Sequence, residues 1–100
     1  MKNNILMLIE QKLKARGLSY EREKILPRSF IGEAKGRNMV DFLVEDKVVL
    51  EVKAVRFVGK DDYYQVRRYL DALGKKLALI VNFRDKIIKI KRVLNSNVQE

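Results

Sequence analysis

Residues 40–53, VDFLVEDKVVLEVK, constrain the fold more than any other part of the chain, because charges interrupt an otherwise apolar pattern. The segment predicts two short strands joined by a polar turn. Three of its charged residues, Asp41, Glu51 and Lys53, stand where strand cores are usually apolar. A charge in a buried strand is costly unless it is paired or binds a metal ion. We therefore expect these three residues to mark a functional site.

The pairing of the two strands follows from the same residues. Strict alternation predicts that Val40 and Phe42 share one face of the first strand. A two-residue hairpin would place Phe42 opposite Glu51, which mixes an apolar face with a charged one. A three-residue turn instead pairs Phe42 with Leu50 and Asp41 with Glu51. The sequence therefore predicts an odd-length or bulged turn, with the two carboxylates side by side.

Hydrophobic periodicity predicts the other elements. The chain is expected to contain, in order, a helix at 3–16, an edge strand at 18–30, the two strands of 40–53, a helix at 62–73, a buried strand at 77–83 and a lysine-bearing edge strand at 86–93. Asn3 or Asn4 is expected to cap the first helix. Asp61 or Asp62 is expected to cap the second. The order strand, helix, buried strand predicts a right-handed parallel crossover.

The composition excludes several kinds of site. One hundred residues with 47% apolar content predict one domain spanning residues 1–100. The chain has neither cysteine nor histidine, which excludes disulfides, His-ligated zinc and triads that need either residue. The lack of cysteine fits a reducing cytoplasm. No apolar run approaches the ~20 residues of a membrane span, and no signal-peptide pattern is present, so we expect no membrane segment.

The net charge of +9 favours a polyanionic partner, nucleic acid ahead of a membrane surface. Lys35 and Arg37 make the expected loop at 29–38 basic, and Arg67 and Arg68 lie on the second helix. These residues are candidate phosphate contacts. The alternative is a solvated basic face that serves solubility.

Asp41 beside Glu51 predicts a metal site. Two adjacent carboxylates repel each other, and one is protonated unless a cation lies between them. Oxygen ligands of this kind suit Mg²⁺. Lys53 projects on the same side as Glu51, where it can activate a water or stabilise charge on a phosphate. The pattern D-x9-E-x-K is what metal-assisted phosphodiester hydrolysis requires. The alternative is an ordinary Asp41–Lys53 ion pair with Glu51 in solvent.

Gln65 and Tyr69 share a face of the second helix, because they are four residues apart. In a functional interpretation, the amide of Gln65 orients a water or a phosphate near the metal. In the structural alternative, Gln65 is an exposed residue of an amphipathic helix.

Four segments, VDFLVEDKVVLEVKAV, QVRRYL, LALIVNF and KIIKIKRV, together resemble the PD-(D/E)xK nuclease superfamily, and most closely its GxxExxY branch. The resemblance covers residues 13–94. It implies an α/β fold of the restriction-endonuclease-like class. This fold has an α-β-β-β-α-β core and a mixed central sheet flanked by two helices, and here it carries an extra C-terminal edge strand.

The resemblance also implies roles for individual residues. Asp41 and Glu51 would bind Mg²⁺ or Mn²⁺, with the backbone carbonyl of Val52 as a further ligand. Lys53 would be the catalytic lysine. Gln65 would be a catalytic residue and, with Tyr69, would match the helical Q-x-x-x-Y element of exonuclease-like members. Tyr69 is also a candidate nucleic-acid contact.

One residue departs from the pattern of that branch, which takes its name from a glycine and a glutamate at the start of the first helix. Counted back from Gly17, the glutamate would fall at about Lys2, so this chain lacks it. Glu10, the only acid of the expected helix, lies about two turns later. This departure is compatible with weak activity, one-metal chemistry, or a binding protein that keeps only the shell of a nuclease.

Three hypotheses remain open from the sequence. The first is a metal-dependent nuclease, with DNA as the expected substrate, of a repair, recombination or defence type. The second is a catalytically weak or inactive nuclease-fold protein that binds nucleic acid or a partner. The third is a metal-free structural protein with a polar seam. A homodimer is compatible with the sequence but is not required by it.

Overall fold

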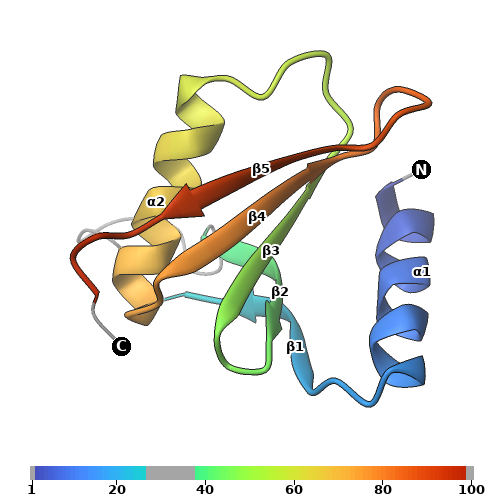
Figure 1. Cartoon of the computed structure of the whole chain (residues 1–100), viewed down its shortest axis with the longest axis horizontal. Helices are drawn as coiled ribbons and strands as arrows, with labels where there is room; N and C mark the ends of the chain where they lie inside the picture. Colours follow the sequence, from blue (N-terminus) through green and yellow to red (C-terminus); the bar gives the residue numbers. More distant parts are fainter. Residues whose placement is uncertain (1, 27–37, 99–100) are drawn as a thin grey trace.

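The structure is a computed structural model, and it describes residues 2–26 and 38–98. Its elements are, in chain order, α1 (Lys2–Ala15), β1 (Tyr20–Ile25), β2 (Met39–Val44), β3 (Val48–Lys53), α2 (Lys60–Leu73), β4 (Leu77–Asn82) and β5 (Lys89–Leu94). The strands form one five-stranded sheet in the order β1-β2-β3-β4-β5, and α1 and α2 lie on opposite sides of it (Figure 1). The predicted α/β fold, a mixed sheet flanked by two helices, is confirmed.

The predicted hairpin and the predicted parallel pairing across the second helix are both present. β3 and β4 are parallel, and α2 connects them. The other three pairs, β1–β2, β2–β3 and β4–β5, are antiparallel. β5 is an edge strand, and five of its six residues are exposed. Lysines on such an edge discourage pairing with another chain.

The turn between β2 and β3 has three residues, 45–47, as predicted, and Phe42 pairs with Leu50. Glu45 and Asp46 both adopt φ 54°. This left-handed conformation is uncommon for residues other than glycine, although aspartate tolerates it better than most. The apolar pattern of the strands thus determined a turn that the turn residues alone would not have predicted.

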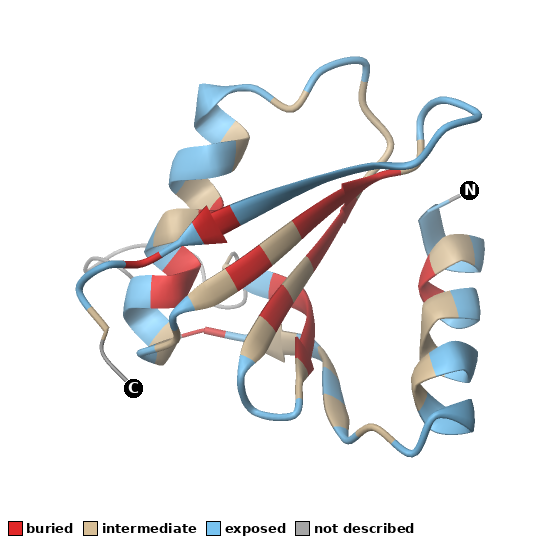
Figure 2. Ribbon diagram, viewed as in Figure 1, coloured by how far each residue is buried: buried red, intermediate tan, exposed pale blue. Residues whose placement is uncertain are grey.

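Two apolar cores lie on the two faces of the sheet. Most of the buried residues are in the strands of the sheet (Figure 2). The core under α2 contains Leu26, Val40, Leu43, Val49, Val66, Tyr69, Leu70, Ala78, Ile80 and Val93. The smaller core under α1 is centred on Leu6, Phe42 and Val52. Val40 and Phe42 therefore belong to opposite cores, and the prediction that they share a face is wrong. Regular pairing between β2 and β3 ends at Phe42, and the strand changes its side-chain alternation there.

Both helices begin earlier than predicted. α1 already includes residue 2, so Asn3 and Asn4 lie within its first turn and do not cap it. α2 has Gly59 at its N-cap, and the side chain of Asp62 accepts a hydrogen bond from the Gly59 N–H at 3.1 Å. Asp62 thus satisfies the helix start from inside the first turn. Gly74 ends α2 with φ 66°, a conformation that glycine adopts without strain.

Within residues 2–26 and 38–98, no helix is long and apolar enough to cross a membrane.

Candidate active site

The carboxylates of Asp41 and Glu51 are buried next to each other, where β2 and β3 stop pairing. Asp41 is 5% exposed and Glu51 is 4% exposed. The backbone N–H of Asp41 donates to Glu51 Oε1 at 2.9 Å, and the N–H of Val52 donates to Asp41 Oδ2 at 2.7 Å. Backbone donors therefore orient both carboxylates, and they leave Asp41 Oδ1 and Glu51 Oε2 outside these two hydrogen bonds.

The environment of Glu51 disfavours its charge. Burial, followed by the negative charge of Asp41, raises the pKa of Glu51 from its ordinary value of 4.5 to about 7. The hydrogen bond from the Asp41 N–H and the charges of Lys53 and Lys2 act in the opposite direction. Near neutral pH, Glu51 is therefore divided between its protonated and ionised forms. A divalent cation beside both carboxylates would favour the ionised form.

Lys53 is held on the α2 side of the sheet. Its Nζ lies 3.6 Å from Oδ1 of Asp62, and the two side chains are 19% and 28% exposed. The same aspartate accepts the hydrogen bond at the start of α2. Asp62 therefore connects the candidate catalytic lysine to the helix, a role that the sequence analysis missed. Its position three residues before Gln65 places both on one helical face and was the available indication.

Lys2 approaches the carboxylates from the other layer. Its Nζ lies 3.4 Å from Asp41 Oδ2. The alternative in which Asp41 pairs with Lys53 and Glu51 is solvated is therefore wrong, because Asp41 pairs with Lys2 and Glu51 is buried.

Glu10 does not join the site. Its carboxylate accepts hydrogen bonds from the Tyr20 hydroxyl at 2.9 Å and from Arg22 Nη1 at 3.1 Å, which connect α1 to β1. In the described part of the chain, no three acidic residues gather in a way that could hold a metal ion. The site consequently has two carboxylates, with lysines on both sides.

The remaining candidate residues differ in how well they face the site. Gln65 is partly buried on the face of α2 that carries Asp62, whereas Tyr69 is 4% exposed and packs in the α2 core. Arg67 is partly buried, and its Nε has no hydrogen-bond partner among the described residues. Arg68 is exposed. The two basic loop residues, Lys35 and Arg37, lie outside the described residues.

Asn82 is a second residue whose role the sequence analysis missed, although it is the next-to-last residue of the LALIVNF segment. It is 6% exposed, pairs in register with Lys53, and fixes the chain just after that lysine. Its Oδ1 accepts from the N–H groups of Val55 and Arg84 at 3.1 and 3.2 Å, and its Nδ2 donates to the Val55 carbonyl at 2.7 Å. The backbone that follows Lys53 is thereby tied to β4.

The donor atoms of this site fit a hard divalent cation. Mg²⁺ prefers oxygen ligands and usually keeps several waters while binding one or two protein carboxylates. Asp41 and Glu51 supply two carboxylates that repel each other in the absence of a cation. The carbonyl of Val52, between Glu51 and Lys53, is the expected further ligand.

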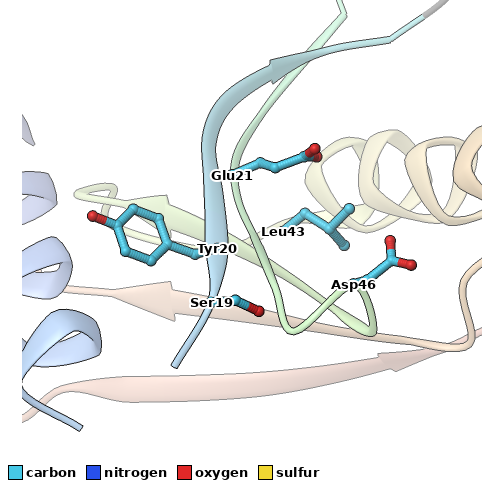
Figure 3. A pocket seen from close by; sticks show the side chains of 5 residues that line it. All are labelled: Ser19, Tyr20, Glu21, Leu43 and Asp46. Carbon is cyan, nitrogen blue, oxygen red and sulfur yellow. The ribbon is translucent and has the colours of Figure 1, made fainter. Parts of the chain in front are cut away.

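A cavity of about 360 Å³ lies elsewhere, beside the turn between β2 and β3. It is lined by Ser19, Tyr20, Glu21, Leu43 and Asp46 (Figure 3). None of the predicted site residues that the structure describes lines it. The carboxylate pair lies toward the opposite ends of the two strands.

Comparison with known proteins identifies the family. A family model described as the PD-(D/E)XK nuclease superfamily matches residues 6–93. The chain therefore belongs to this superfamily. The match includes Asp41, Glu51, Lys53 and Gln65 but begins after Lys2.

A solved structure supports the fold. The crystal structure of an alkaline exonuclease, LHK-Exo, from Laribacter hongkongensis aligns with a TM-score of 0.61 and 13% sequence identity. The alignment covers 88% of this chain and 53% of that one, so the chain spans about half the length of the exonuclease. At this identity the likeness shows the fold alone. The search among curated proteins found no sequence match.

Proposed function

We propose that this chain is a nuclease that uses Mg²⁺ or Mn²⁺ to hydrolyse phosphodiester bonds, with DNA as its expected substrate. The observation that carries the proposal is a pair of buried carboxylates at the point where β2 and β3 separate, in a chain of this superfamily. The charges of Asp41 and Lys53 both act on Glu51. A buried like-charged pair is destabilising unless a cation compensates it. Such a pair is expected where binding an ion is the function.

Asp41, Glu51 and the Val52 carbonyl would hold the ion. When bound, a divalent ion polarises a phosphate oxygen and lowers the pKa of a bound water. The N–H groups of Asp41 and Val52 orient the two carboxylates, and so reduce the reorganisation that binding requires.

Lys53 supplies positive charge next to the carboxylates. Held by Asp62, its ammonium can stabilise charge on the phosphate or orient the attacking water. Gln65 lies on the same face of α2, and its amide can donate to the same water or phosphate. Arg67, Arg68 and the basic residues Lys35 and Arg37 are expected to contact the nucleic-acid backbone. Tyr69 would support this face from within the core.

The test is a cleavage assay on single-stranded, duplex and branched DNA and on RNA, with Mg²⁺, Mn²⁺ or EDTA. We expect cleavage with a metal ion, no cleavage with EDTA, and a loss of about a hundredfold or more for Lys53→Met. Lys47→Met is the matched control, because it removes the same charge from an exposed position in the β2–β3 turn. The proposal fails if the wild type cleaves none of these substrates faster than Lys53→Met does.

A second candidate function is nucleic-acid binding without cleavage. One observation favours it: the ammonium of Lys2 contacts Asp41, where a metal-dependent nuclease would bind its ion. It predicts salt-dependent binding without metal-dependent cleavage. In that case Asp41→Asn should leave affinity unchanged with or without Mg²⁺, because the affinity would come from the surface lysines and arginines. A filter-binding or fluorescence-anisotropy titration at two salt concentrations distinguishes the two functions.

A further inference from the structure

Lys2 occupies a position that the proposed chemistry does not use. Its Nζ lies 3.4 Å from Oδ2 of Asp41. The Asp41 side chain is 7% exposed, whereas that of Lys2 is 47% exposed. The ammonium therefore lies at the mouth of the site, and the carboxylate lies inside it.

The other charges near Asp41 and Glu51 determine what the contact between Lys2 and Asp41 can do. Lys53 is already paired with Asp62, 3.6 Å away. Among residues 2–26 and 38–98, Lys2 is therefore the cation that directly contacts the pair, through Asp41. A divalent ion bound to Asp41 would share that carboxylate with an ammonium of like charge, and the two cations repel.

We propose that Lys2 is a built-in counter-ion of the metal site, so that a divalent ion binds Asp41 by displacing the Lys2 ammonium. The proposal rests on the proposed function, in which Asp41 and Glu51 bind the ion. Lys2 then sets the metal affinity. Its charge compensates Asp41 in the absence of metal and competes with the metal for the same carboxylate.

Displacement is feasible because Lys2 lies in the first turn of α1, on a flexible four-carbon side chain that is nearly half exposed. Ion pairs with this much exposure are weak. We therefore expect the pair to oppose metal binding by roughly twofold to fivefold. A carboxylate at the same place would add a ligand, and charge count is a principal determinant of divalent-ion affinity.

The experiment is a titration of the full chain with Mn²⁺ alone, without nucleic acid, followed by isothermal calorimetry and by the signal of free Mn²⁺ in electron paramagnetic resonance. Lys2→Gln removes the charge, and Lys2→Glu replaces it with a carboxylate. Lys12→Gln is the matched control, since it removes one exposed lysine from the same helix. Thermal unfolding without metal checks that each variant folds.

Relative to Lys12→Gln, we expect Lys2→Gln to bind Mn²⁺ about threefold more tightly and Lys2→Glu about tenfold or more. In an Asp41→Asn background, Lys2→Gln should have no such effect, because the pair is already broken. The saturated Lys2→Glu variant should also show the larger rise in melting temperature.

The outcomes separate this inference from the proposed function. If the wild type binds Mn²⁺ through Asp41 but Lys2→Gln binds no more tightly than Lys12→Gln, the counter-ion role is wrong and the metal site stands. Weaker binding by Lys2→Gln also overturns the role, since it would make Lys2 a support of the site. If no variant binds Mn²⁺, even with Lys2→Glu, the proposed metal-dependent function fails and the inference fails with it.

Discussion

Replacing Glu51 with glutamine is expected to stabilise the metal-free protein at pH 8 and to leave its stability nearly unchanged at pH 4. Glu51 ionises near pH 4.5 when the chain is unfolded and near pH 7 when it is folded, because burial and Asp41 oppose its charge. Below pH 4.5 both states are protonated. Between these values only the folded state retains the proton, so the free energy of unfolding decreases as the pH rises. Above about pH 7 Glu51 is ionised in both states, and the free energy of unfolding decreases no further on its account.

The magnitude follows from the two pKa values. The difference between 4.5 and about 7, at about 1.4 kcal/mol for each pH unit, corresponds to about 3 kcal/mol lost by the wild type at pH 8. Glutamine carries no charge, and its Oε1 can still accept the hydrogen bond from the Asp41 N–H. At pH 8 the free energy of unfolding of Glu51→Gln should therefore exceed that of the wild type by about 2–3 kcal/mol.

Urea denaturation with EDTA, at several pH values from 4 to 8, measures this difference. Glu21→Gln is the control, because Glu21 is 58% exposed and pairs only with the nearby Lys24 among the described residues. It should change stability by no more than about 0.5 kcal/mol at any pH. With Mg²⁺ added, the wild type should become more stable and Glu51→Gln should not. An equal effect of Glu51→Gln at pH 4 and pH 8, or destabilisation at pH 8, would refute the reasoning.

Three further substitutions test the scaffold of the site. Leu70→Ala should lower the free energy of unfolding by about 2–5 kcal/mol in urea denaturation, because Leu70 is fully buried in the α2 core. Asn82→Ala should cost about 1–3 kcal/mol by the same measurement, since it leaves partly buried backbone groups of Val55 without their partner. Asp62→Asn should change the free energy of unfolding by less than about 1 kcal/mol, because its ion pair with Lys53 is partly exposed. Thermal melting measures this change, and a larger one would contradict the prediction.

The sequence predicted the order of the elements along the chain and the register of β2 and β3, because those features depend on apolar periodicity. Phe42 had to pair with Leu50 once both strands needed one apolar face, and the three-residue turn followed. Asp41 and Glu51 were predicted as site residues for the complementary reason, because they are charges within an otherwise apolar pattern. These inferences concern neighbouring residues in one hairpin, where spacing alone determines contact.

The partners of Lys53 and Asp41 could not be predicted in this way. Lys53 pairs with Asp62 across the connection from β3 to α2. Asp41 pairs with Lys2, which lies in the first turn of α1. Both contacts depend on how the helices lie against the sheet, which no local periodicity specifies. The prediction that Val40 shares a face with Phe42 was wrong for a related reason. Alternation assumes a regular strand, and β2 is irregular next to the buried Asp41.

That departure also provides the hydrogen bonds of the site. A strand paired regularly along its whole length would direct its N–H groups to carbonyl groups of the neighbouring strand. Because the β2–β3 ladder ends at Phe42, the N–H groups of Asp41 and Val52 donate to carboxylates instead. Buried carboxylates need such donors. The end of the ladder and the acidic pair therefore depend on each other, and a substitution that extended the pairing of β2 with β3 would remove the donors that hold the site.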